Sequence, residues 1–175
     1  MTLAHPKKNI SQLGLESGDY VADLGAGPGK YALACAEAVG ETGQVTAVEI
    51  QKTLVKKVET KAREAGYTNV DVLWADLEKK HATSLKDESQ DAVICANVLF
   101  QMQDKSALFK EAKRILKPGG RLLLVDWEDS HGGLGPKKDH VVPESQARSV
   151  ADNFGFSVSQ IISAGDHHYG IIFTI

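Results

Sequence analysis

The chain has 175 residues, of which 42% are hydrophobic and 25% are charged, values typical of one soluble globular domain. The formal net charge of −3 gives no overall attraction to nucleic acid or to an anionic membrane. No apolar run approaches the roughly 20 residues of a membrane span, and no apolar stretch follows Lys7 and Lys8 as in a signal peptide, so we expect a cytoplasmic protein.

The first recognisable elements surround a glycine-rich run. Residues 1–19 form a polar lead that contains a short helix, Pro6–Leu13, which Gly14 ends. Residues 21–24 predict a short buried strand, and residues 31–39 are rich in alanine and predict a helix. Between them, three alternating glycines allow a tight turn whose backbone can approach a ligand closely. A strand, a glycine turn and a helix in this order favour a ligand-binding loop.

The rest of the chain alternates in the same way until residue 125. Strands are predicted at 44–50, 70–74, 91–97 and 121–125, with helices at 51–65, 104–116 and 143–154. Residues 117–120, Lys-Pro-Gly-Gly, predict a helix stop and a turn. The last two strands, 156–162 and 169–175, have no helix between them and must therefore be antiparallel.

This order predicts a fold of the α/β class. A mainly parallel sheet needs helices on both faces, so we expect a three-layer α/β/α sandwich with an antiparallel C-terminal hairpin. No repeat or composition break divides the chain, and we predict a single domain over residues 1–175. Within it, residues 1–19 are the N-terminal helical lead, and residues 128–142 form a loop on the substrate side.

Acidic residues stand where two of the predicted strands end. Ligands of such sheets bind at the carboxyl ends of the strands, where the strand order reverses. Glu49 closes the second strand, and a carboxylate there can accept both hydroxyls of a ribose. Asp76 follows the third strand and can accept an exocyclic amino group such as that of adenine. Together they predict an adenosine site beside the glycine turn.

Two other nucleotide-binding motifs fit the turn less well. The dinucleotide fingerprint requires G-x-G-x-x-G, whereas Gly25, Gly27 and Gly29 have G-x-G-x-G spacing and Lys30 takes the place of the third glycine. A P-loop requires Ser or Thr after Gly-Lys, and Tyr31 stands there. Pyrophosphate binding is therefore the weaker hypothesis.

Five motifs of the sequence, in order along the chain, resemble those of one known family. Residues 23–29, Asp-Leu-Gly-Ala-Gly-Pro-Gly, resemble motif I of the class I S-adenosylmethionine-dependent methyltransferases. The acid at Glu49, the run 74–77, the strand 91–97 and the run 116–126 resemble the later motifs of that class in the same order. The resemblance covers residues 13–175 and is closest to the small methyltransferase type 11 domains. It implies a Rossmann-like, seven-stranded sheet.

The resemblance also implies a role for each matching position. S-adenosylmethionine would be the cofactor and S-adenosylhomocysteine the product. Asp23 would orient the glycine turn, Glu49 would hold the ribose, and Asp76 would accept the adenine amino group. The full set of implied cofactor residues is Asp23, Gly25, Ala26, Gly27, Glu49, Ile50, Asp76, Leu77 and Asn97.

Candidate catalytic residues follow the fifth strand. Asp126 ends that strand and is expected to face the substrate. His131 and His140 flank the loop over the substrate side, and histidine has the right pKa to take a proton near neutrality. His167 and His168 fall in the terminal hairpin turn, where we expect a surface position. Trp127 either stacks on a substrate or covers the edge of the sheet.

The sequence indicates the donor of the methyl group but not its acceptor. We expect methyl transfer to a small-molecule nucleophile, with no metal ion, no nucleic acid and no membrane as partner. The short lead leaves little to enclose a substrate, so we expect either an open site, a homodimer in which a second subunit covers the site, or a large substrate. Two alternatives stay open, namely an NAD(P)-dependent oxidoreductase and a non-catalytic S-adenosylmethionine-binding module.

Overall fold

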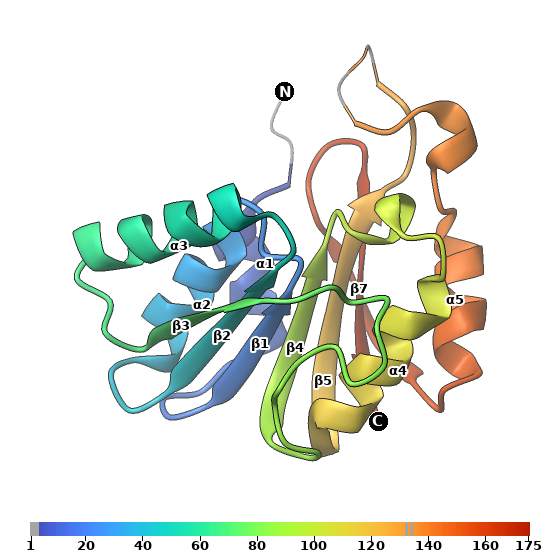
Figure 1. Cartoon of the computed structure of the whole chain (residues 1–175). Coiled ribbons are helices and arrows are strands. Elements are labelled where there is room, and N and C mark those ends of the chain that lie inside the picture. Colours follow the sequence, from blue (N-terminus) through green and yellow to red (C-terminus); the bar gives the residue numbers. More distant parts are fainter. Residues whose placement is uncertain (1–3, 132, 134) are drawn as a thin grey trace.

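A single seven-stranded sheet dominates the computed structural model, which describes residues 4–131, 133 and 135–175 (Figure 1). Positions 1–3 of the expected lead and positions 132 and 134 of the expected substrate-side loop lie outside the described residues. The strands are β1 (Tyr20–Leu24), β2 (Gln44–Glu49), β3 (Val70–Trp74), β4 (Gln90–Ala96), β5 (Leu116–Trp127), β6 (Ser157–Ser163) and β7 (His168–Thr174).

The helices connect these strands in the predicted alternation. They are α1 (Pro6–Leu13), α2 (Lys30–Val39), α3 (Lys52–Glu64), α4 (Lys105–Ile115) and α5 (Glu144–Asp152), with two 3₁₀ turns, η1 (Leu99–Gln101) and η2 (Lys138–His140). The expected helix stop at Gly14 is present, since this residue takes the left-handed conformation with φ of 70°.

The strand order β3-β2-β1-β4-β5-β7-β6 confirms the predicted sheet. The first five strands are parallel, and β7 runs antiparallel to both β5 and β6. The chain builds outward from β1 to β3 and then returns to place β4 on the other side of β1. This reversal opens a crevice at the carboxyl ends of β1 and β4, where ligands of open α/β sheets bind.

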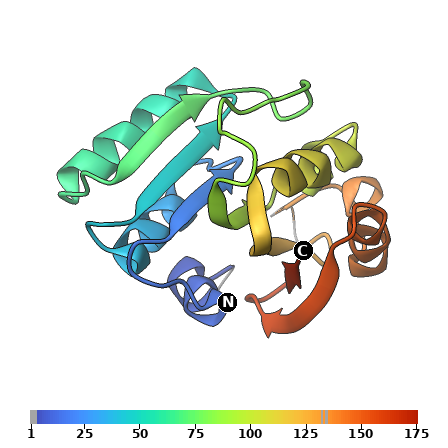
Figure 2. The ribbon, with the colours of Figure 1, turned by 90° about the horizontal axis from the view of Figure 1, so that it is seen from below.

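Two helical layers cover the sheet, as the predicted sandwich requires (Figure 2). On one face α1, α2 and α3 pack over a core that includes Val21, Val45 and Ile94. On the other face α4 and α5 pack over a core that includes Leu24, Leu122 and the aromatic group Phe109, Phe156 and Phe173. The small buried residues Ala32, Cys35 and Ala36 let α2 approach the sheet closely.

The fifth strand is longer than the sequence predicted. The expected turn at 117–120 lies inside β5, whose pairing with β4 shifts register between Gln90 and Ala92. The end of the chain explains this difference, because Gly119 donates its N–H to the Ile175 carbonyl and Ile175 donates to the Gly120 carbonyl. Gly119 keeps a left-handed φ of 76°, so the expected turn is present within β5, and the bonds to Ile175 tie it to the end of the chain.

A buried ion pair fixes the irregular segment between β3 and β4. Glu111 on α4 is 4% exposed, and its Oε1 accepts hydrogen bonds from the Thr83 backbone N–H and hydroxyl at 2.9 and 2.7 Å. Arg114 lies 2.6 Å from the same carboxylate and 2.6 Å from Asp87. The charge pair therefore anchors a chain segment that has no regular secondary structure of its own.

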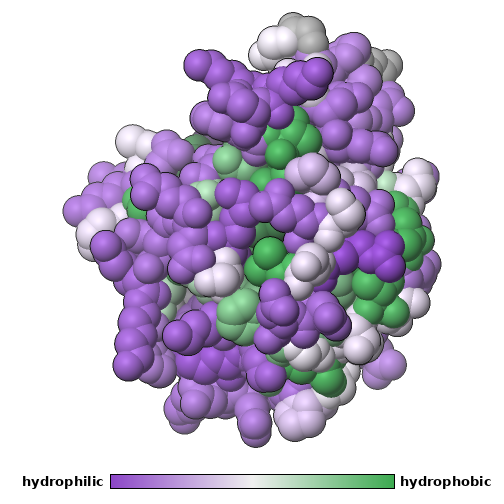
Figure 3. All heavy atoms as spheres, turned by 90° about the vertical axis from the view of Figure 1, so that its right-hand side faces the viewer, coloured by the Kyte–Doolittle hydropathy of each residue, from purple (hydrophilic) through white to green (hydrophobic). Residues whose placement is uncertain are grey.

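The face of the molecule around β6 and α5 is mainly hydrophilic (Figure 3). On the face shown in Figure 3, hydrophobic atoms form small groups separated by polar ones. Val158 and Ile161 on the edge strand β6 are among the exposed large hydrophobic residues, at 39% and 51% exposure. No helix among the described residues is long and apolar enough to cross a membrane.

Candidate active site

A cavity of about 440 Å³ lies at the carboxyl ends of the parallel strands. Its walls come from the turns after β1, β2, β3 and β4, from the end of β5 and the start of β7, and from Ala4 and Pro6 in the N-terminal lead. The volume falls in the range of roughly 300–1,000 Å³ that is usual for sites of small ligands. The cavity therefore occupies the place that the strand order predicts for a ligand.

Eight of the nine residues implied as cofactor-binding line this cavity. They are Gly25, Ala26, Gly27, Glu49, Ile50, Asp76, Leu77 and Asn97. The ninth, Asp23, lies beneath the glycine turn with 1% exposure, and its Oδ2 has no hydrogen-bond partner among the described residues. Burial raises the pKa of its carboxyl to about 7, and the nearby Glu49 charge adds to this effect.

The glycine turn needs its glycines for two different reasons. Gly25 has a φ of 80°, and a Cβ there would lie 2.4 Å from Cγ2 of Val98, so the Val98 side chain leaves no room for a side chain at this position. Gly27 has a φ of 54°, but a Cβ built there would meet no protein atom within 4 Å. At a residue that lines the cavity, this open space is where a ligand can approach the bare backbone.

Glu49 connects the end of β2 to the glycine turn. Its Oε2 accepts a hydrogen bond from the Gly27 N–H at 2.9 Å, and its Oε1 accepts one from the Gln51 N–H at 2.8 Å. The side chain is 5% exposed and borders the cavity. A carboxylate has about four acceptor sites, so each oxygen keeps one for a ligand hydroxyl.

The end of the cavity near β3 combines one carboxylate with apolar side chains. Oδ1 of Asp76 accepts the Glu78 N–H at 3.0 Å, and the carboxylate stays about one-third exposed. Ile50, Leu54 and Leu77 line the cavity nearby. A flat apolar group with an amino substituent, such as adenine, fits this combination of surfaces.

Asn97 lines the cavity and carries an unsatisfied side-chain acceptor. Its backbone takes the left-handed conformation with φ of 60°, held by an N–H bond to the Val125 carbonyl and by the Gln101 side chain, which donates to the Asn97 carbonyl. Its Oδ1 is buried and has no partner among the described residues. Because an unpaired buried acceptor is unfavourable, this atom favours a ligand with a hydrogen-bond donor.

Trp127 and His168 form the opposite end of the cavity. They are paired residues in the antiparallel β5–β7 register, and their ring centroids lie 4.2 Å apart. Both side chains are more than nine-tenths buried and line the cavity. The prediction of a surface position for His168 is therefore wrong. Because β7 runs antiparallel, its first residue lies at the edge of the sheet where the parallel strands end.

Asp126 does not face the cavity, contrary to the expectation for a substrate-side carboxylate. It is fully buried one residue before Trp127, and successive strand side chains point to opposite faces. Its Oδ2 accepts the Leu99 N–H at 2.9 Å, and its Oδ1 accepts the Trp127 N–H at 2.8 Å. Burial raises its pKa to about 6, and these backbone donors oppose that shift. The carboxylate holds η1 against β5.

Neither His131 nor His140 lines the cavity. His131 stacks on His167 with ring centroids 3.9 Å apart, and His167 Nδ1 lies 2.9 Å from Asp129 Oδ1. His140 is exposed in η2, where its nearest acidic partner is Asp139 at 3.9 Å. The structure thus joins His131 to the hairpin turn and leaves His140 at the surface.

The cavity fits S-adenosylmethionine in its polar groups. Carboxylates at Glu49 and Asp76 suit a ribose and an amino group, and the bare backbone at Gly27 and the free Asn97 oxygen suit the amino-acid part. Among the described residues, no group of three or more His, Cys, Asp or Glu side chains is placed to hold a metal ion.

Comparison with known proteins shows the family of the chain. A family model described as "Methyltransferase domain" matches residues 15–163. A curated relative from Pseudoalteromonas translucida, named ubiquinone/menaquinone biosynthesis C-methyltransferase UbiE, is 33% identical over 122 residues, which are 69% of this chain and 47% of the relative. The chain thus spans about half the length of the curated relatives it matches.

Solved structures are similar over nearly the whole chain. A SAM-dependent methyltransferase from Aquifex aeolicus matches with a TM-score of 0.89 and 28% identity, covering 99% of this chain and 90% of that one. A protein from Sulfolobus solfataricus described as a type 11 methyltransferase matches with a TM-score of 0.76 and 25% identity, covering 98% and 92%. The chain therefore belongs to the class I S-adenosylmethionine-dependent methyltransferases of the type 11 kind.

Proposed function

We propose that this protein transfers a methyl group from S-adenosylmethionine to a small-molecule acceptor. The observation that carries the proposal is the cavity that the glycine turn, Glu49, Asp76 and Asn97 line together. Family membership supports the reaction type. The curated relatives are named C-methyltransferases, and that name supports a small organic acceptor for this chain.

The order of the strands gives the cavity a direction. Asp76 and Glu49 follow β3 and β2, Gly25 and Gly27 follow β1, and Asn97 follows β4. We assign the adenine and ribose to the first two strand ends and the amino-acid part to the next two. When bound, S-adenosylmethionine supplies a methyl group on a sulfonium, which is already activated for displacement.

The acceptor then belongs at the β5 and β7 end, beside Trp127 and His168. Neighbouring strands are about 4.8 Å apart, so β2 and β5 are separated by roughly 14 Å across the sheet. This span accommodates a nucleoside with an extended amino acid. Trp127 lines this end and offers an apolar wall for the acceptor.

Calorimetric titration tests the cofactor assignment directly. We expect S-adenosylhomocysteine to bind and NADH not to bind; NADH binding without S-adenosylhomocysteine binding would contradict the proposal and favour the oxidoreductase. Transfer of labelled methyl groups to a panel of phenols, amines and carbon acids then tests catalysis. Cofactor binding with no transfer to any member would favour a non-catalytic module.

A further inference from the structure

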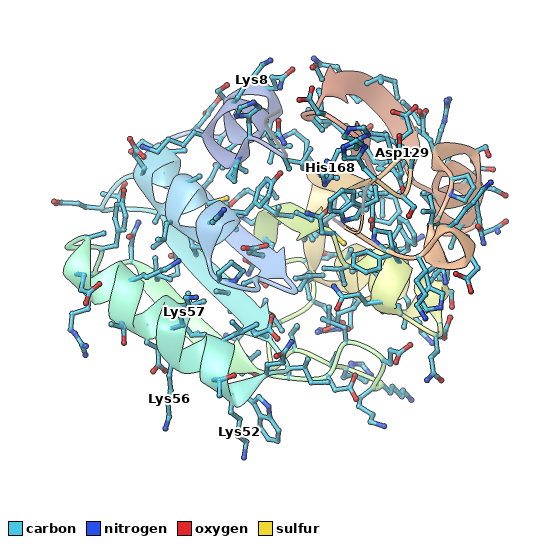
Figure 4. The ribbon with its side chains drawn as sticks, turned by 90° about the horizontal axis from the view of Figure 1, so that it is seen from above. Lys8, Lys52, Lys56, Lys57, Asp129 and His168 are labelled. Atoms are coloured by element: carbon cyan, nitrogen blue, oxygen red, sulfur yellow. The ribbon has the colours of Figure 1, made fainter. Side chains whose placement is uncertain are left out.

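We propose that His168 is a catalytic residue, whose Nε2 accepts the proton of a hydroxyl group on the methyl acceptor. The inference rests on the proposed function, since it concerns the acceptor end of the same cavity. Figure 4 looks onto the carboxyl ends of the parallel strands and shows His168 with Asp129 on one side of the sheet, away from the lysines of α3. Four features of His168 carry the argument.

The first feature is the tautomer of the imidazole. Nδ1 lies 2.7 Å from the backbone carbonyl oxygen of Asp166. A carbonyl oxygen only accepts hydrogen bonds, so Nδ1 must carry a hydrogen. In the neutral ring, Nε2 then holds the lone pair. A backbone contact thus fixes which nitrogen is available as a base.

The second feature is the lack of a partner for that nitrogen. Nε2 is buried and has no hydrogen-bond partner among the described residues, although the side chain is only 6% exposed. His168 also lines the cavity. A buried acceptor on a cavity wall is satisfied when a ligand brings a donor to it.

The third feature is a rigid surrounding. The His168 ring lies against Trp127, and a Cβ at Gly135 would come within 2.7 Å of the Trp127 ring, so the loop backbone packs onto the indole. The imidazole is therefore held between the hairpin turn and the end of β5. Such a fixed ring keeps Nε2 in one orientation, and because this atom has less than 1 Å² of accessible surface, the acceptor must bring its hydroxyl into the packed end of the cavity to reach it.

The fourth feature is the local charge. Burial is the largest effect and lowers the pKa of His168, the hydrogen bond to the Asp166 carbonyl opposes it, and the smaller effects of His167 and Asp129 lower and raise the pKa respectively. Asp129 is already engaged by His167 Nδ1 at 2.9 Å. The balance keeps the imidazole neutral near pH 7, which is the state that can take a proton.

These features match the needs of an O–H acceptor. A neutral hydroxyl is a weak nucleophile until its proton leaves, so a positioned base assists this group in particular. The proton moves to Nε2, and the electron pair of the O–H bond stays on oxygen. The oxygen forms its bond to the methyl carbon while the carbon–sulfur bond breaks and its electron pair remains on sulfur. The imidazolium later releases its proton to water.

The protonation of His168 can be measured without turnover. In a Trp74→Phe variant, Trp127 is the remaining indole, and protonation of the adjacent imidazole quenches its fluorescence. We expect a fluorescence titration with a midpoint below about 6.5, the ordinary histidine value. Added to the Trp74→Phe protein, His168→Asn keeps a donor for the Asp166 carbonyl but lacks Nε2. We expect this second substitution to abolish the titration. The same titration in His168→Asn would overturn the proposal.

A matched pair of probes tests the acceptor role. In the presence of S-adenosylhomocysteine, we expect phenol to bind the Trp74→Phe protein at least ten-fold more tightly than anisole, which has no hydroxyl. The preference should disappear in His168→Asn. Equal binding of both probes to the parent protein, or an unchanged preference in His168→Asn, would overturn the inference.

Calorimetry with S-adenosylhomocysteine on the Trp74→Phe protein, with and without His168→Asn, distinguishes a failure of the proposed function from a failure of the role of His168. We expect equal affinity, because His168 lies at the acceptor end. If neither protein binds S-adenosylhomocysteine, the proposed function fails. If both bind it and the probe preference is absent, only the role of His168 fails.

Discussion

The backbone N–H of Gly27 donates a hydrogen bond to Glu49 over 2.9 Å and thereby joins the turn after β1 to the end of β2. The carboxylate that should hold the ribose is thus also the group that shapes the glycine turn. Any change at Glu49 acts on the ligand directly and through the turn, and the two effects reinforce each other.

We expect Glu49→Ala to weaken S-adenosylhomocysteine binding by about 1–3 kcal/mol, the scale for removing one partner of a buried polar contact. The substitution removes a ligand acceptor and leaves the Gly27 and Gln51 N–H groups without their partner. Glu49→Gln keeps one oxygen and should lose less affinity. Calorimetry decides, and equal affinity of all three proteins would refute the assigned ribose site.

Gly27→Ala should fold and yet bind ligand poorly. A Cβ at Gly27 meets no protein atom, so its main cost is the left-handed backbone, about 1–2 kcal/mol of unfolding free energy. The added methyl group enters the ligand space, and we expect S-adenosylhomocysteine affinity to fall at least ten-fold.

Gly66→Ala is the matched control for this variant. Gly66 has a φ of 77° and equally open surroundings, but it follows α3 and does not line the cavity. Urea unfolding should show a similar loss of stability, and calorimetry should show unchanged affinity. A similar loss of affinity in both variants would mean that strain, and not contact with ligand, explains the effect.

The buried carboxyl of Asp126 should make stability depend on pH. Its pKa rises from 3.8 to about 6 on folding, so between these values the native state binds the proton and the unfolded state does not. Stability contributed by this group therefore falls as pH rises from about 4 to about 6, by on the order of 3 kcal/mol. The same group contributes no further change above that range.

Asp126→Asn isolates this contribution from that of Asp23, whose pKa is also raised. The difference in unfolding free energy, variant minus parent protein, should rise by on the order of 3 kcal/mol as the pH is raised from 4 to 7.5, because only the parent loses the stability contributed by Asp126. Urea unfolding at both pH values measures the difference. A constant difference would show that Asp126 titrates alike in the folded and unfolded chains.

Arg114→Ala should destabilise the protein strongly, because it leaves the Glu111 carboxylate buried without its cation. Breaking a buried pair in this way costs about 3 kcal/mol or more. Arg148→Ala removes a surface pair with Glu144 and should cost less than about 1 kcal/mol. Comparable losses for both arginines in urea unfolding would contradict the structural role given to Arg114.

The sequence could predict which residues line the cavity after β1, β2 and β3 because each of them lies within a few positions of a strand end. The glycines, Glu49 and Asp76 follow β1, β2 and β3 directly, and parallel strands bring their carboxyl ends to one edge. Local pattern and strand alternation were therefore enough. No such local pattern in the sequence predicted that residues of β5 and β7 line the other end of the cavity together.

The sequence by itself determined the alternation of strands and helices, the mainly parallel sheet and the place of the glycine turn, since these depend on local hydrophobic periodicity and turn chemistry. Only the tertiary structure decided that Asp126 is buried while Trp127 faces the cavity, and that His168 joins it there. Those outcomes depend on the antiparallel register of β5 and β7. Register is set by packing between distant segments, and a shift of one residue reverses every side chain.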